Sequence, residues 1–280
     1  MADDRMLDDR ILKVTKAVSA VIIPILTAAF VILFLFPDHT KQLWAWTIQS
    51  HMTTMLMGGG YLAGAYFFTR VVTGRRWHRV GVGIPAITLF ATILGVTTFV
   101  HWDKFNHGHI SFWAWTALYV TTPVLLPWLW VRNRRFDPGT PEPGERLVPE
   151  PVRRVMVLVG ALQLLLALTL FVRPSLFLDQ WPWPLTPLTA RTLSAFIAFP
   201  AVVYLSFAWD RRTSSFRVPI ELVTFGLAMI GIASIRASGE FRGSGFKVGG
   251  FRVGLVVTLG LLVALRVLVL EGGASSGVDA

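Results

Sequence analysis

The sequence contains no cysteine and little charge. Of its 280 residues, 15% are charged and 54% are hydrophobic, and the mean hydropathy is +0.59. Soluble domains carry about 25% charged residues, so this chain lacks the polar residues that would cover a water-exposed surface. The absence of cysteine excludes disulfides, thiolate metal sites and cysteine nucleophiles. The composition therefore predicts a protein whose surface is covered largely by lipid.

Common catalytic and nucleotide-binding signatures are also missing. There is no Walker loop, no dinucleotide-binding glycine pattern, no Gly-x-Ser-x-Gly elbow and no His-Glu-x-x-His. Lysine and arginine outnumber acidic residues by 26 to 16. In a membrane protein such an excess orients the helices and contacts lipid headgroups. We therefore expect the bilayer, and anionic lipids at its cytoplasmic face, as partners, and no nucleic acid.

Long apolar runs are abundant instead. A helix needs about 20 apolar residues to cross the hydrocarbon core, and eight stretches meet this requirement. They are approximately 17–36, 44–68, 80–100, 111–131, 155–172, 190–209, 218–235 and 251–270. These runs are too long and too continuously apolar for the strands of a barrel. The sequence predicts an all-α membrane protein with eight transmembrane helices.

A motif at the end of the first run occurs again near the middle of the chain. LFLFP followed by WAW (33–46) resembles LFVRP followed by WPW (170–183) at an offset of 137 residues. Because four runs precede the proline-rich segment FDPGTPEPGERLVPEP and four follow it, both halves enter the membrane in the same direction. We predict two parallel tandem four-helix repeats, 1–135 and 153–280, joined by a cytoplasmic linker at 136–152.

Basic residues predict the orientation. With the N-terminus inside, seventeen lysines and arginines fall on inner segments and eight on outer ones, which places both termini in the cytoplasm. The first run is too long for the core of a signal peptide and is expected to remain as the first helix. The apolar spacing of Met6, Ile11 and Val14 before it indicates a short helix along the interface.

Histidine distinguishes the first half from the second. Five of the six histidines lie on the predicted outer side, and the matching outer loop of the second half has none. Imidazole and carboxylate are suitable ligands for zinc, copper or nickel. The candidate metal ligands are His51, His101, Asp103, His107 and His109. Their spacing matches no specific metal motif, so polar residues in a hydrated loop are the competing interpretation.

The stretch HMTTMLMGGG raises a second possibility. On a helix, His51 and Met55 share a face, and imidazole with thioether suits Cu(I) or an axial haem position. Methionine also fills gaps in packed helices. Gly60 and Gly64 are spaced for close helix packing. Four Trp-x-Trp pairs lie at predicted helix ends, which is typical of the aromatic belt at the lipid headgroups; an aromatic cage for a ligand is the alternative.

The first half resembles a family of multi-pass integral membrane proteins of high-GC, actinobacterial-type bacteria, to which no activity is assigned. The resemblance rests on three stretches of this sequence. They are Pro37, Asp38, Thr40, Trp46, Thr47 and Ile48; Gly60, Tyr61, Ala63 and Gly64; and His101, Trp102, Asp103 and Phe105. It covers about the first 135 residues and implies a multi-pass protein of the bacterial plasma (inner) membrane.

These observations leave three functional hypotheses. The leading one is binding or transport of a small molecule through an outward-facing pocket between the halves. Its expected lining is His51, Met55, His101, Asp103, Trp44 and Trp46. The alternatives are a membrane redox protein that holds copper, zinc or haem through the outer histidines, and a structural subunit of an oligomer or larger complex. Glu221 is the only acid within a predicted span, which argues against an ion-coupled carrier.

Overall fold

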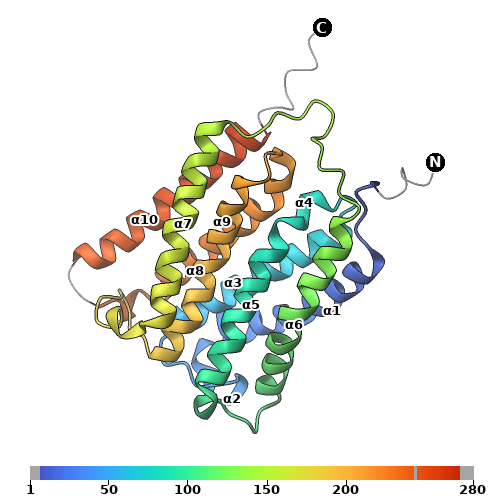
Figure 1. Ribbon diagram of the computed structural model, residues 1–280. Helices are drawn as coiled ribbons and strands as arrows, with labels where there is room; N and C mark the ends of the chain where they lie inside the picture. Colours follow the sequence, from blue (N-terminus) through green and yellow to red (C-terminus); the bar gives the residue numbers. More distant parts are fainter. Residues whose placement is uncertain (1–6, 243–244, 272–280) are drawn as a thin grey trace.

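The computed structural model describes residues 7–242 and 245–271, and in these residues the architecture is all-helical, with no strand. Eight helices of 18 residues or more form the bundle (Figure 1). They are α1 (Lys13–Phe30), α3 (His51–Thr73), α5 (Gly83–Val100), α6 (Ile110–Arg134), α7 (Glu150–Val172), α8 (Pro187–Leu205), α9 (Thr213–Arg236) and α10 (Gly245–Ala264). Two single-turn helices, α2 (Thr40–Leu43) and α4 (His78–Gly81), precede α3 and α5. The prediction of an all-α protein is confirmed.

Seven of the long helices in the described residues, several extended by a terminal turn, are long and apolar enough to cross a membrane. The exception is α3, which contains threonines, glycines and tyrosines and buries 14 of its 23 residues. It packs against α1, α8 and α9. A helix enclosed by protein does not need to present apolar side chains to lipid, which accounts for its polar composition.

The second predicted run does not form one helix. Residues 44–50 are not helical, and α3 begins only at His51. Ser50 is its N-cap: the Ser50 hydroxyl accepts the backbone N–H of Thr53 at 3.2 Å. Such a cap satisfies a donor that the first helical turn leaves unpaired. The segment that carries Trp44 and Trp46 is therefore a loop folded onto the bundle.

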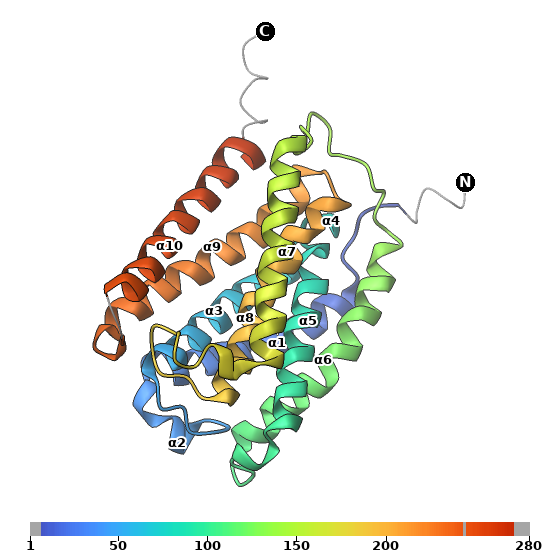
Figure 2. The same cartoon turned by 60° about the vertical axis from the view of Figure 1, so that its left-hand side comes forward.

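Corresponding elements recur in the two halves. In each half the first helix is followed by a 3-10 turn, two more long helices, a second 3-10 turn and a last helix. The matching 3-10 turns are Pro37–His39 and Trp102–Lys104 in the first half, and Pro174–Leu176 and Ser238–Glu240 in the second; a further 3-10 turn, Ser206–Ala208, follows α8. The packing recurs as well: α1 lies on α3 as α7 lies on α8, and α3 lies on α9 as α8 lies on α5. The last helices, α6 and α10, lie on opposite sides of the bundle (Figure 2).

Glycines allow α3 to contact its neighbours closely. A side-chain carbon at Gly58 would lie 2.8 Å from the backbone nitrogen of Phe34, and one at Gly59 would lie 2.6 Å from the Cβ of Met229. Both distances are below van der Waals contact, so any larger residue would force the helices apart. The interpretation of this glycine stretch as a packing surface is confirmed at these two positions.

The N-terminal segment and the linker are packed against the same end of the bundle. Residues 7–12 are not helical, and Asp9 adopts a positive φ of 56°. The Asp9 N–H donates to the carbonyl of Phe136 at 2.8 Å, and the Val148 N–H donates to the carbonyl of Arg211 at 2.8 Å. The predicted interfacial helix before α1 is therefore wrong over the described residues, because Asp9 and Ile11 are buried instead; Met6 lies outside them.

Candidate ligand-binding site

His51 lies at the end of the bundle opposite the linker, the end that the sequence predicts to be the outer one (Figure 2). It is the first residue of α3 and its side chain is 41% exposed. Its Nε2 lies 2.8 Å from Asp38, and its Nδ1 lies 2.7 Å from Glu240. Both ring nitrogens are therefore engaged by carboxylates. Neither faces the bundle interior.

Glu240 caps the start of α3 from the second half of the chain. Its carboxylate accepts the N–H groups of His51 and Met52 at 2.8 and 3.0 Å, and the hydroxyl of Ser50 at 2.8 Å. Burial by itself raises the pKa of Glu240, but these hydrogen bonds and the nearby His51 outweigh it, so the net shift is downward. A carboxylate at this position also complements the positive end of the helix dipole.

Met55 does not share the environment of His51. It is 2% exposed and belongs to an apolar cluster with Phe34, Leu170 and Trp183. The predicted imidazole–thioether pair is therefore not formed. Met55 fills the interface between the two halves, as methionine commonly does in packed helices.

The outer loop residues have separate partners. His101 Nε2 accepts a hydrogen bond from Arg191 at 2.8 Å, and Asp103 pairs with Lys104 at 2.8 Å. Burial, and then the positive charge of Arg191, lower the pKa of His101. His107 packs against Trp102 and Phe112, and the His109 Nδ1 lies 3.2 Å from the carbonyl of Trp44.

The five candidate metal ligands are consequently dispersed. His51 is held by Asp38 and Glu240, and His101 by an arginine. Over residues 7–242 and 245–271, no group of three or more histidine or acidic side chains is placed to hold a metal ion. The interpretation as polar residues of an outer loop fits this arrangement better than a shared copper, zinc or haem site.

Trp44 and Trp46 are core residues rather than part of an aromatic belt. They are 5% and 3% exposed, and both pack against Trp115 in edge-to-face geometry at 5.7 and 5.0 Å. The loop before α3 folds inward and buries these rings in the protein. In the described residues neither indole N–H has a hydrogen-bond partner, which leaves two buried donors beside Trp115.

A groove of about 730 Å³ lies beside these rings, between α1 and α6. Its walls combine aliphatic, aromatic and a few polar side chains. They include Ile25, Trp44, Tyr61, His109, Ala114 and Trp115. Pockets of this size with apolar walls and a few placed polar groups are typical ligand sites.

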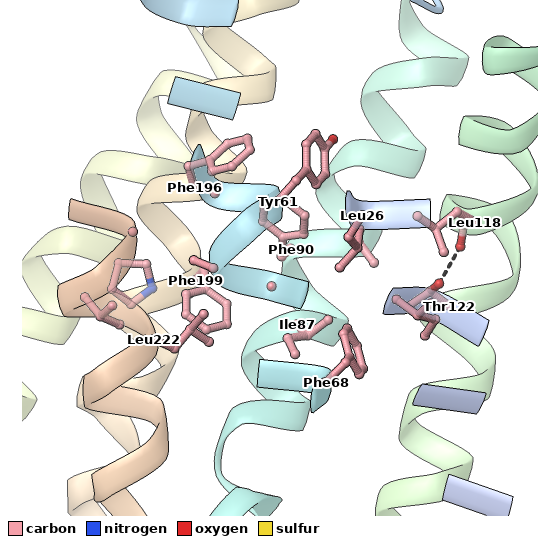
Figure 3. Close-up of a pocket in the computed structure, with 18 of the residues that line it drawn as sticks. Leu26, Tyr61, Phe68, Ile87, Phe90, Leu118, Thr122, Phe196, Phe199 and Leu222 are labelled. Atoms are coloured by element: carbon pink, nitrogen blue, oxygen red, sulfur yellow. Dashed lines mark hydrogen bonds between the residues drawn. The ribbon is translucent and has the colours of Figure 1, made fainter. Parts of the chain in front are cut away.

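A second cavity, of about 140 Å³, lies deeper in the bundle (Figure 3). Both halves contribute side chains to its wall. They include Leu26, Phe68 and Phe90 from the first half, and Phe196, Phe199 and Leu222 from the second. Gly60 and Gly64 of α3 also line it. The cavity is almost entirely apolar, and the four aromatic rings named here account for much of its wall.

The groove and the cavity adjoin each other. Leu26, Tyr61, Leu118 and Tyr119 line both. The hydroxyl of Tyr119 donates to the hydroxyl of Tyr61 at 3.0 Å, and both rings are buried. A pair of hydrogen-bonded tyrosines therefore stands where the outer groove meets the central cavity.

Most of the residues predicted to line a pocket lie outside these two spaces. Of the proposed residues, Trp44 lines the groove, and His109 from the metal set lines it too. His51, Met55, Trp46, His101 and Asp103 line neither cavity. The residues that do are aromatic and small side chains within the helices, such as Tyr61 and Gly64. In the sequence, the Gly-Tyr-x-Ala-Gly stretch is the feature that could have indicated these residues. Helical periodicity alone, however, does not distinguish a cavity wall from ordinary helix packing.

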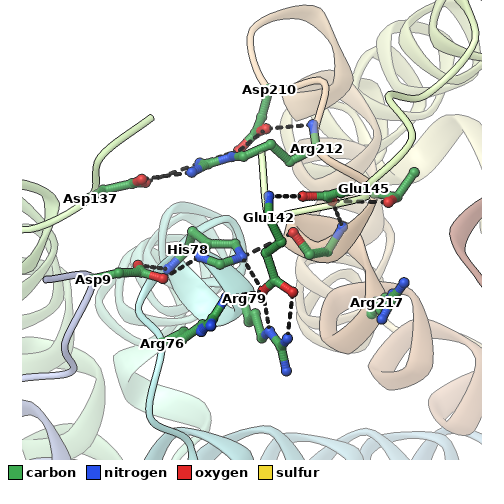
Figure 4. A network of polar contacts seen from close by, with 12 residues as sticks. Asp9, Arg76, His78, Arg79, Asp137, Glu142, Glu145, Asp210, Arg212 and Arg217 are labelled. Carbon is green, nitrogen blue, oxygen red and sulfur yellow. Dashed lines mark hydrogen bonds and ion pairs between the residues drawn. The ribbon is translucent and has the colours of Figure 1, made fainter. Parts of the chain in front are cut away.

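A polar network at the linker end was not predicted (Figure 4). His78 is 3% exposed; its Nδ1 contacts Asp9, and its Nε2 lies 2.9 Å from the Ser214 hydroxyl and 3.1 Å from Glu142. Glu142 also pairs with Arg79 at 2.7 Å. The hydrogen bond from Arg79, together with the nearby arginine charges, lowers the pKa of Glu142 to about 2 against the opposing effect of burial.

The linker supplies further contacts to this network. Asp137 pairs with Arg212 at 2.6 Å, and Arg212 also binds Asp210 at 2.7 Å. Glu145 accepts the hydroxyl of Thr213 at 2.9 Å and the first-turn N–H of Ser214, which caps α9. The linker therefore holds the start of α9 in place. In the sequence, the acidic residues of the linker and the arginines around 75–79 and 211–217 are the features from which these ion pairs could have been predicted.

No family model matches the chain, and no curated protein or solved structure matches it either.

Proposed function

We propose that this membrane protein binds an apolar small molecule that enters the groove between α1 and α6 and reaches the central cavity. The observation that carries the proposal is that the two spaces adjoin, with Tyr61 and Tyr119 lining both. A closed bundle without a ligand would be expected to fill such space with side chains, because protein interiors pack to crystal-like density.

The chemistry of the walls restricts the ligand. Both spaces are mainly apolar, so most of the ligand must be hydrocarbon. The few polar side chains include the two tyrosines, Gln42, Thr122 and His109. Ser111 also lines the groove, and its hydroxyl has no hydrogen-bond partner in the described residues. The ligand class that fits is a membrane-soluble molecule with one or two oxygen atoms at one end.

The charge distribution favours binding or passive transfer over ion-coupled transport. Glu221 of α9 is bound by the hydroxyl of Tyr66 at 2.6 Å and by Arg266. Arg266 also pairs with Glu271 at 2.8 Å. An acid already held by two partners is poorly suited to exchange protons or cations with the groove.

The repeat architecture and the orientation are part of this proposal. Eight crossings as two parallel four-helix repeats are supported by the recurring element order and by the reciprocal packing of α3 on α9 and α8 on α5. The basic residues beside the linker support a cytoplasmic position for that end. The chain ends themselves, residues 1–6 and 272–280, lie outside the described residues. A bacterial plasma membrane follows only from the family resemblance.

Two alanines on α6 allow a matched test. Both are exposed, but Ala114 lines the groove and Ala117 does not. The detergent-purified protein would be titrated with a fatty acid, a diacylglycerol and an isoprenoid quinone, with thermal stability as the readout, because a ligand that binds the native state raises the unfolding temperature. We expect at least one of the three to stabilise the wild type and the Ala117→Trp variant.

The Ala114→Trp variant should lose that response, with an affinity reduced by roughly tenfold or more, because the indole occupies the groove. Equal responses of the two variants would place binding elsewhere, and no response to any of the three ligands in the wild type would refute the proposed ligand class. If binding is established, flux of the same ligand in proteoliposomes separates a carrier from a binding protein.

A further inference from the structure

A third groove, of about 1,120 Å³, lies at the linker end of the bundle. It is bounded by α5, α6, the linker and the turn between α8 and α9. It does not share lining residues with the outer groove or the central cavity. An inference about it is therefore independent of the ligand proposed above.

The mouth of this groove carries two unpaired cations. Arg134 and Arg211 line it and are exposed, and no carboxylate in the described residues pairs with either. The guanidinium of Arg134 lies over the ring of Trp130 at 4.9 Å, which leaves its N–H groups free at the rim. Arg212 also lines the groove, but Asp137 and Asp210 neutralise it.

The floor of the groove is apolar and extends into the membrane. Val82, Pro85, Leu89 and Thr92 follow one face of α5. The Thr92 hydroxyl donates to the carbonyl of Thr88 at 2.8 Å, so it presents mainly its methyl group to the groove. The ten helical steps from Val82 to Thr92 extend about 15 Å, which is half of the roughly 30 Å hydrocarbon core.

Helix α6 forms the opposite wall, and its lining residues change from charged at the mouth to apolar further in. Arg134, Trp130 and Pro127 are spaced three and four residues apart and line the groove in that order from its mouth. Trp209, 65% exposed, lies at the same end. Arginine beside exposed indole rings is the composition expected at the headgroup level of a membrane.

We propose that this groove binds one anionic phospholipid of the adjacent leaflet, with its phosphate at Arg134 and Arg211 and an acyl chain along α5. The free guanidinium groups match a phosphate, and the apolar floor matches the depth of one leaflet. Bound there, the lipid contacts α5, α6 and the turn before α9. It thereby joins the two halves beside the linker.

The test compares two charge-matched double variants of the full chain. Arg134→Gln with Arg211→Gln removes the two groove cations. Arg75→Gln with Arg135→Gln removes two exposed arginines outside the groove that form no ion pair within residues 7–242 and 245–271. Native mass spectrometry and thermal stability in detergent would be measured with dioleoylphosphatidylglycerol, dioleoylphosphatidylcholine and inorganic phosphate.

We expect phosphatidylglycerol to bind the wild type and the Arg75/Arg135 variant more tightly than phosphatidylcholine. The Arg134/Arg211 variant should lose about thirtyfold in affinity for phosphatidylglycerol, since each of the two basic residues near an anionic lipid contributes about fivefold. Leu89→Trp, which keeps every charge and narrows the floor, should weaken the lipid but not inorganic phosphate.

Three results would overturn the proposal. Equal losses in the two double variants would indicate general surface attraction. Stabilisation by inorganic phosphate as strong as that by the lipid would indicate a soluble-anion site. Equal binding of the two phospholipids by the wild type would remove the role of the headgroup charge. Unchanged melting temperatures of the lipid-free variants would establish that each is folded.

Discussion

Each end of the bundle carries a histidine whose two ring nitrogens face carboxylates, but the two differ in burial. At the outer end His51 lies between Asp38 and Glu240 with 41% of its side chain exposed. At the linker end His78 lies between Asp9 and Glu142 with 3% exposed. The chemical groups are the same, whereas the exposed fraction of the histidine side chain differs more than tenfold.

This difference decides what each cluster does. Water screens the exposed pair, and such surface pairs contribute about 0–1 kcal/mol. Around His78 there is little water, so each group depends on its protein partners, and removal of one leaves a charge that is both buried and unpaired. His78 also contacts three separate segments, namely the N-terminal segment before α1, the linker and the start of α9.

The largest expected effect is at His78. His78→Ala should lower the free energy of unfolding by about 3–5 kcal/mol, because the buried Asp9 loses the imidazole and keeps only the backbone N–H of residue 78. Denaturant unfolding in detergent measures the loss. His39→Ala is the matched control: His39 is exposed and makes no side-chain hydrogen bond within the described residues, so a change within about 0.5 kcal/mol is expected. Similar losses in the two variants would remove the contrast between the ends.

A pH titration of Glu142 should show an intermediate effect. Its pKa of about 2, below the ordinary value of 4.5, means that the ionised form is favoured in the folded state. The stabilisation is therefore fully present above about pH 4.5 and is lost as the pH falls through about 2. The stability difference between wild type and Glu142→Gln should shrink over that window. A difference that is constant with pH would contradict the ion pairs with Arg79 and Arg76.

The smallest effects are expected at the outer end. Glu240→Ala should cost about 1–2 kcal/mol, because α3 loses the acceptor of its first N–H groups. His51→Ala should cost less than about 1 kcal/mol, since its ring is partly exposed. A double-mutant cycle gives the coupling between the two residues. A loss at His51 as large as that at His78 would show that exposure does not distinguish the clusters.

The sequence by itself determined the class of the protein. Apolar runs of membrane length are a local property, and seven of the helices confirm them. The polar composition of α3 and its start at His51 could not be predicted in this way, because both depend on the elements that surround the segment. A helix enclosed by its neighbours does not need apolar side chains. Helix α3 begins at His51, where Ser50 caps its first turn, although the apolar run begins several residues earlier.

The sites were decided by the tertiary structure. Outer histidines looked like a cluster because they are close in sequence, but His101 is bound by Arg191, ninety residues away. The sequence predicted no site at His78, yet Asp9, Glu142 and Ser214 contact it from three distant segments. Side-chain spacing along a chain predicts shared sites only within one helix or loop. The grooves and the networks arise between elements, where packing alone determines which residues meet.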